Sequence, residues 1–266
     1  FRYDRAKRSK DIMADTETIH CERGGTSGPM LVLLHGLGAN GAVWDGLRPF
    51  LAQHWRGRWL IPDFRGHGRS FHRAHYGIGI HAADVAELLQ QDEEVTLIGH
   101  SMGGVVGIAL ATGMFGVRVR RVVAFSVKVD WTDDEVSRVQ AVAKAPPRMF
   151  ATKEEAIDRY LRVAGLKGIV APDSAVAESG ISERQGQFRL AADPRSNALG
   201  TPDFARLARA ADAPLHLLCG ELDNIARAQS MRRLGAAVTE LPGLGHNLHV
   251  EAPQALWQAI EADLQG

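Results

Sequence analysis

Short apolar runs alternate along this chain with longer segments of helical apolar spacing. Buried strands are predicted at residues 30–34, 59–61, 95–98, 121–127, 215–219 and 238–241, and a weaker one at 18–21. Helices are predicted at residues 42–53, 80–89, 105–111 and 255–264. The alternation predicts an α/β fold, with a mostly parallel central sheet of about seven to eight strands flanked by helices.

Residues 131–210 interrupt this alternation, with helical patterns and no convincing strand. Thr132 with Glu135, and Thr152 with Glu155, have the spacing of a helix capping box. Ligands of α/β folds bind beyond the carboxyl ends of the strands. We therefore expect residues 131–210 to form an inserted helical cap or lid over a core of residues 1–130 and 211–266, although a run of ordinary surface helices would give the same pattern.

Composition narrows the class of protein. Hydrophobic residues make up 45% of the chain, and Lys+Arg and Asp+Glu each number 31, which argues against nucleic-acid binding. The apolar runs are too short to cross a membrane, and no secretory leader is recognised. Cys21 and Cys219 are expected to be free thiols of a cytoplasmic protein, a monomer or homodimer, and Met13 is a candidate natural start.

The candidate chemistry is concentrated after the predicted strand at 95–98. Gly99-His100-Ser101-Met102-Gly103 matches the G-x-S-x-G nucleophile elbow, a sharp strand-to-helix turn that needs glycine neighbours. The helix that follows directs its unpaired N–H groups at charge developing beside Ser101. Ser101 is therefore our candidate nucleophile.

A serine hydroxyl needs a base to remove its proton. Histidine in a glycine-rich loop after a late strand suits this role, and His246 follows Gly245 there. His249 is its main rival, and His100, beside the nucleophile, is expected to point away.

The acid that orients the base should precede it in the chain. Asp223 follows the predicted buried strand at 215–219 and is our candidate. Asp130 remains an alternative, and Glu221 a weaker one.

Taken together, these motifs resemble the α/β-hydrolase family over nearly the whole chain, in particular its serine esterase and lactonase branch with a helical lid. They are His35-Gly36-Leu37-Gly38, residues 63–70, residues 99–103, Gly220-Glu221-Leu222-Asp223, and Gly245-His246 followed by Glu251-Ala252-Pro253. The resemblance implies the order Ser101, Asp223, His246, and an oxyanion hole formed by the backbone N–H groups of Leu37 and Met102. One departure is a single weak strand before Met30, where the family often has two.

The family hosts several reactions, so the resemblance alone does not select one. Ser101 argues against the epoxide and haloalkane hydrolases, which use a carboxylate nucleophile. His100 and His35-Gly36 favour ester, thioester or lactone cleavage in a small, partly apolar molecule over C–C bond hydrolysis of the meta-cleavage product type. A non-catalytic small-molecule receptor on the same scaffold is a further alternative.

Three aromatic residues are candidate substrate contacts: Trp44, Phe150 and Phe188. For Trp44, a core position in its helix is the better interpretation. The histidines at 67, 72, 75 and 81 match no standard zinc spacing, so we expect no metal and no cofactor. His35 and Asp63 are expected to hold their loops by hydrogen bonds.

Overall fold

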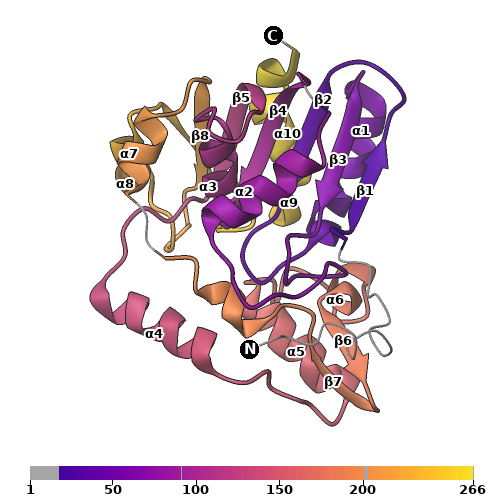
Figure 1. Cartoon of the computed structure of the whole chain (residues 1–266). Coiled ribbons are helices and arrows are strands. Elements are labelled where there is room, and N and C mark those ends of the chain that lie inside the picture. Colours follow the sequence, from indigo (N-terminus) through magenta and orange to yellow (C-terminus); the bar gives the residue numbers. More distant parts are fainter. Residues whose placement is uncertain (1–17, 91, 201–202, 266) are drawn as a thin grey trace, which may run out of the picture.

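The computed structural model describes residues 18–90, 92–200 and 203–265; the candidate start at Met13 lies outside them. A seven-stranded sheet in the order β1-β3-β2-β4-β5-β8-β9 forms the centre (Figure 1). Every neighbouring pair is parallel except β1 and β3, so the predicted α/β fold is confirmed. Within the described residues, β1 is the one strand before β2. The strands are β1 (Cys21–Gly24), β2 (Met30–Leu34), β3 (Arg58–Pro62), β4 (Glu94–His100), β5 (Arg118–Phe125), β8 (Leu215–Gly220) and β9 (Val238–Leu241).

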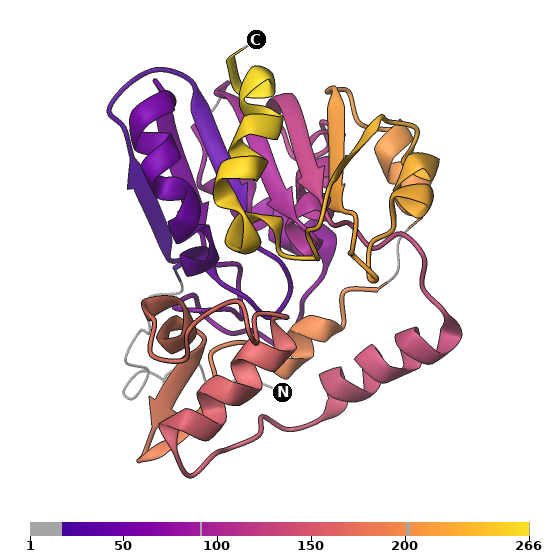
Figure 2. The same cartoon turned by 180° about the vertical axis from the view of Figure 1, so that it is seen from behind.

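Helices cover both faces of this sheet, which explains why β2 is apolar at every position. Helices α2 and α3 lie on one face, and α1 and α10 on the other (Figures 1 and 2). Successive residues of β2 face opposite sides: Val32 packs with the α3 cluster and Leu33 with the α10 cluster. The core helices are η1 (Gly41–Leu47), α1 (Arg48–His54), α2 (Ile78–Glu87), α3 (Met102–Leu110), α7 (Phe204–Arg209), α8 (Ala228–Met231), η3 (Arg232–Leu234), α9 (Leu248–Glu251) and α10 (Pro253–Gln265).

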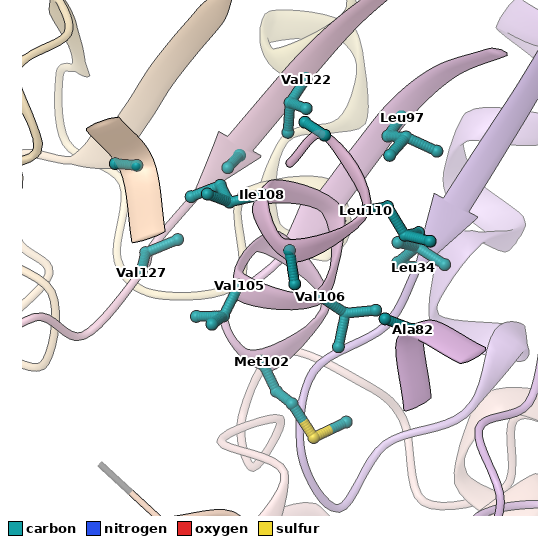
Figure 3. Close-up of a cluster of buried hydrophobic side chains, with 14 of the residues drawn as sticks. Leu34, Ala82, Leu97, Met102, Val105, Val106, Ile108, Leu110, Val122 and Val127 are labelled. Carbon is teal, nitrogen blue, oxygen red and sulfur yellow. The ribbon is translucent and has the colours of Figure 1, made fainter. Parts of the chain in front are cut away.

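Helix α3 is buried along its whole length, as its small, apolar sequence predicts. Leu110 packs beside Leu34 of β2, and Val106 lies beside Ala82 of α2 (Figure 3). This packing fixes the N-terminus of α3 at the carboxyl end of β4.

The segment from Trp131 to Asn197 lies beyond the carboxyl ends of the parallel strands (Figures 1 and 2). The expectation that it contains no strand is wrong, because β6 and β7 form an antiparallel hairpin. Its turn has two positive φ angles, at Gln185 (53°) and Gly186 (75°), and glutamine there is a weak turn signal. The elements are α4 (Asp133–Lys144), α5 (Lys153–Val163), α6 (Ala175–Ser179), β6 (Ile181–Arg184), β7 (Gln187–Leu190) and η2 (Pro194–Asn197).

Capping explains where the two longer helices of this segment begin. At α4 both halves of the predicted capping box are present, between Thr132 and Glu135. At α5 the Thr152 hydroxyl accepts from Glu155 N, but the Glu155 carboxylate accepts from Ala151 N instead of Thr152 N. Helix α4 has no buried residue, so little packing holds it to the core. Helix α7, inside the predicted cap range, packs against α3 and η3 of the core.

No helix in the described part of the chain is long and apolar enough to cross a lipid bilayer. Cys21 and Cys219 are both free, as expected.

Candidate active site

Ser101 occupies a strained turn between β4 and α3. Its φ of 50° and ψ of −114° lie in a region that non-glycine residues rarely adopt. The turn is held by a 2.9 Å hydrogen bond from Ser101 N to Phe125 O, and a Cβ added at Gly99 or Gly103 would overlap backbone atoms. These close approaches explain the glycines of the G-x-S-x-G pattern.

The loop at residues 35–38 lies directly against this turn. A Cβ added at Gly36 would lie 3.5 Å from the Ser101 Cβ. His35 Nδ1–H donates to Gly36 O (2.7 Å), and His35 Nε2 accepts from Phe64 N (2.9 Å). Burial lowers the pKa of His35 to about 3, so the ring is neutral and can accept.

Asp63 holds the neighbouring loops. Its carboxylate accepts from Gly41 N (2.7 Å) and Arg69 N (2.8 Å). The expected structural roles of His35 and Asp63 are therefore confirmed, and together they fix Leu37 next to Ser101.

His246 and Asp223 are joined by a hydrogen bond. His246 Nδ1–H donates to Asp223 Oδ2 over 2.8 Å, which leaves Nε2 as the acceptor nitrogen of a neutral ring. The other carboxylate oxygen, Oδ1, accepts from Ile225 N and Ala226 N, each at 2.9 Å. Burial acts to raise the pKa of Asp223, but these hydrogen bonds outweigh it and lower the pKa below its ordinary value.

Glu251 holds the backbone on both sides of His246. Its carboxylate accepts from Gly245 N (2.6 Å) and from Asn247 N (2.8 Å). Sequence reasoning included Glu251 only as part of a family motif. The sequence signal for this role was the position of Glu251: it lies five residues after His246, at the end of a helical turn, from which a carboxylate can reach back to the preceding backbone N–H groups.

The alternative acids and bases lie elsewhere. Asp130 is exposed and pairs with Arg233 and Ser230. Glu221 is exposed and accepts from Gly243 N (2.9 Å). Among the described residues, Asp223 is the one carboxylate that hydrogen-bonds the His246 ring.

His249, the rival base, and His100, beside the nucleophile, are both buried. His249 packs between Trp44 and His100, and neither of its ring nitrogens has a partner among the described residues. Burial lowers its pKa to about 3. His100 is directed at the His246 loop, where its Nε2–H donates to His246 O (3.1 Å).

Ser101 lies in the walls of two cavities. The first, called here the apolar cavity, has a volume of about 310 Å³ and is lined by Val105 of α3, Val139 of α4 and other mostly apolar side chains. The second, the polar cavity, measures about 530 Å³ and also contains His246, Asn247 and Glu251. Leu37 borders both cavities. No hydrogen bond joins Ser101 Oγ to His246 among the described residues.

The three predicted substrate contacts are not brought to Ser101. Trp44 is fully buried, edge-on to Phe125 in the core. Phe150 and Phe188 pair with each other through backbone hydrogen bonds of 2.8 and 3.0 Å. None of the three lines either cavity. The helical spacing of Val136 and Val139 was a signal for the cavity wall that sequence reasoning missed.

The other histidines do not form a metal centre. His67 and His81 are buried beside His35 and Phe64. Within the described ranges no group of three or more His, Cys, Asp or Glu residues could hold a metal ion.

Comparison with known proteins gives consistent matches. The model of a family described as "Alpha/beta hydrolase family" matches residues 31–259. Lipase LipV of Mycobacterium tuberculosis is 32% identical over 162 residues, which cover 52% of this chain and 61% of the lipase. The pimeloyl-[acyl-carrier protein] methyl ester esterase of Aeromonas hydrophila is 42% identical over 96 residues, 35% of this chain and 36% of that protein. The chain thus spans less than two thirds of the length of either relative.

Among solved structures, E-2-(acetamidomethylene)succinate hydrolase superposes with a TM-score of 0.78 over 93% of this chain and 95% of that chain. At 22% identity this is a likeness of fold.

Proposed function

This chain belongs to the alpha/beta hydrolase family, and we propose that it is a serine hydrolase that cleaves a carboxylic ester, thioester or lactone of a small, partly apolar molecule. The observation that carries the proposal is the strained Ser101 turn, which shares a cavity with a histidine hydrogen-bonded to a buried aspartate. The similarity to a lipase and to a methyl ester esterase supports ester chemistry.

The first step forms an acyl-enzyme. Ser101 Oγ attacks the carbonyl carbon while His246 Nε2 takes its proton, and Asp223 stabilises the resulting imidazolium through Nδ1–H. The backbone N–H groups of Leu37 and Met102 donate to the oxyanion, and loss of one such donor typically costs about a hundredfold or more in rate. His246 then gives its proton to the leaving oxygen or sulfur atom as the bond to the carbonyl carbon breaks.

The second step releases the acid. A water molecule attacks the Ser101 ester, and His246 Nε2 takes the water proton. Collapse of the second tetrahedral intermediate returns that proton to Ser101 Oγ. The net reaction consumes one water and yields a carboxylic acid and an alcohol or thiol.

We also propose that residues 131–197 act as a cap over this site. The support is that Val139 of α4 and Ala164, next to α5, line the two cavities that border Ser101. Helix α4 has no buried residue and can move without breaking a core, whereas Tyr160 and Leu161 of α5 are buried in one hydrophobic cluster with Leu33 of β2.

The test is hydrolysis of p-nitrophenyl esters from acetate to decanoate, combined with a fluorophosphonate label. We expect labelling at Ser101, and Ser101→Ala should lower kcat/KM by about a thousandfold or more without changing Tm. Ser137→Ala, at an exposed serine of α4, is the matched control and should retain activity. Substantial activity in Ser101→Ala would reject the nucleophile. Labelling without ester turnover would instead favour C–C cleavage or a receptor.

A further inference from the structure

The two cavities beside Ser101 differ in one respect that matters for chemistry: His246 lines the polar cavity and not the apolar one. Building on the proposed function, we propose that the substrate lies across Ser101 with its acyl group in the apolar cavity and its leaving group in the polar cavity. The preferred substrate is then an ester or thioester that joins an uncharged, apolar acyl group to a larger amphipathic leaving group.

The direction follows from the path of the proton. When the first tetrahedral intermediate collapses, the leaving atom must receive the proton held on His246 Nε2. The leaving group therefore departs on the side of His246, through the polar cavity. The same cavity then admits the water that deacylates the enzyme, with Asn224, Asn247 and Glu251 in its wall to bind water. The acyl group, which stays bonded to Ser101 until water attacks, therefore occupies the apolar cavity.

The lining of the apolar cavity suits an acyl chain without charge. Met102 and Val105 of α3 form one side, and Val136 and Val139 of α4 form the other. Of the described residues in the wall, Lys128 is the one with a charged side chain. Its Nζ is paired with Glu135 over 2.7 Å and lies 5.0 Å from the centroid of the Trp131 ring. Its charge is thus already compensated, and a carboxylate on the acyl chain would gain little from it.

The rim of the polar cavity indicates the kind of leaving group. Seven large apolar side chains are exposed in the described residues, and four of them border this cavity. They are Val163 (45% exposed), Ile169 (41%), Leu222 (66%) and Ile225 (47%). Such clustering of exposed apolar surface marks a binding surface. A leaving group with apolar surface for the rim, and with a polar group for Asn224, satisfies both parts.

The experiment varies each half of the substrate separately. One series keeps p-nitrophenol and lengthens the acyl chain from acetate to decanoate. The other keeps butyrate and enlarges the leaving group from methanol through phenol to 2-naphthol. Each variant is compared with the wild type on the same ester, so that differences in leaving-group pKa cancel.

Val139→Trp should shorten the acyl optimum, with kcat/KM falling about tenfold for each methylene group that no longer fits. Its leaving-group preference should stay as in the wild type. Val136→Trp is a second variant of the same wall. Val142→Trp, on the same helix at a 45% exposed position outside both cavities, is the matched control and should change neither series.

Leu222→Ser should change the leaving-group series and not the acyl series. The preference for naphthyl over methyl butyrate should fall about tenfold, and the optimal acyl-chain length should stay unchanged. Met114→Ser, at a 72% exposed position away from both cavities, is its control.

Two results would overturn the assignment of the acyl group to the apolar cavity and of the leaving group to the polar cavity. In one, Val139→Trp changes the leaving-group preference and Leu222→Ser the acyl optimum; in the other, the protein hydrolyses esters but neither variant changes either series. Both results would leave the proposed function standing. Absence of both turnover and Ser101 labelling in the wild-type protein would reject the proposed function and this assignment together.

Discussion

The side-chain amide of Asn247 donates a hydrogen bond to the backbone oxygen of Gly165, 3.1 Å away. Asn247 directly follows His246, and Gly165 follows the C-terminal end of α5, so this contact ties the candidate base to the cap. A second, longer contact of 3.4 Å reaches Ala164 O. Asn247 is buried, and its backbone N–H is held by Glu251. The His246 loop is thus fixed from both the core and the cap.

Asn247→Ala should therefore loosen the cap and the His246 loop together. We expect kcat/KM to fall about tenfold and Tm to fall by about 2–4 °C, the effect of losing one buried hydrogen bond. Asn247→Asp should be worse, because it places a carboxylate against two carbonyl oxygens. Ester kinetics and thermal unfolding of both variants check this, and an Asp variant as active as the wild type would contradict it.

Glu251 is predicted to position His246 through the backbone. Glu251→Gln keeps one acceptor oxygen but turns an amide N–H₂ group toward the second backbone N–H, so we expect kcat to fall about tenfold or more with a smaller change in KM. Glu221→Gln is a matched control, since Glu221 accepts from Gly243 N in the same loop but is exposed. Equal losses in the two variants would argue against a specific role for Glu251.

A comparison of two aspartates tests the choice of acid. Asp223→Asn removes the carboxylate that orients His246, and kcat should fall by about a thousandfold or more. Asp130→Asn disturbs only exposed contacts with Arg233 and Ser230, so its kcat should stay within about twofold of the wild type. Steady-state kinetics of both variants decide the point, and the opposite order of effects would assign the acid to Asp130.

Buried histidines predict how stability depends on pH. Burial lowers the pKa of His35, His67, His81 and His249 from 6.5 to about 3. Between these values the unfolded chain binds protons that the folded chain does not, so stability is full above pH 6.5 and is lost as the pH falls toward 3. Asp223, whose folded pKa is also lowered, adds to the loss in the acid range where it takes up its proton.

His81→Phe tests this mechanism at one position. Both ring nitrogens of His81 lack partners among the described residues, and its ring lies 4.9 Å from that of Phe64, centroid to centroid. Phenylalanine should fill the same space without a proton to bind. Thermal unfolding from pH 7.5 to 4.5 should give a shallower fall in Tm for the variant, and a slope equal to that of the wild type would contradict the prediction.

Local patterns along the chain were sufficient for the architecture and for the Ser101 turn. The alternation of strands and helices depends on side-chain periodicity, and the glycine at 99 on its close approach to the backbone of Gly103 and Gly104. The capping box at Thr132 and Glu135 is equally local. The strands and helices, the glycine at 99 and the capping box depend on residues close to one another in the chain. The sequence by itself therefore determined them.

Tertiary structure alone decided which distant residues meet. Asp223 and Asp130 both follow buried strands, yet only Asp223 reaches the His246 ring; His249 has the same residue type as His246 but packs into the core beside Trp44. The cavity walls likewise depend on how α4 lies over α3, and Phe150 and Phe188 pair with each other instead. Cavities form where packed elements leave space between them, and that space is a property of the assembled layers rather than of any one segment.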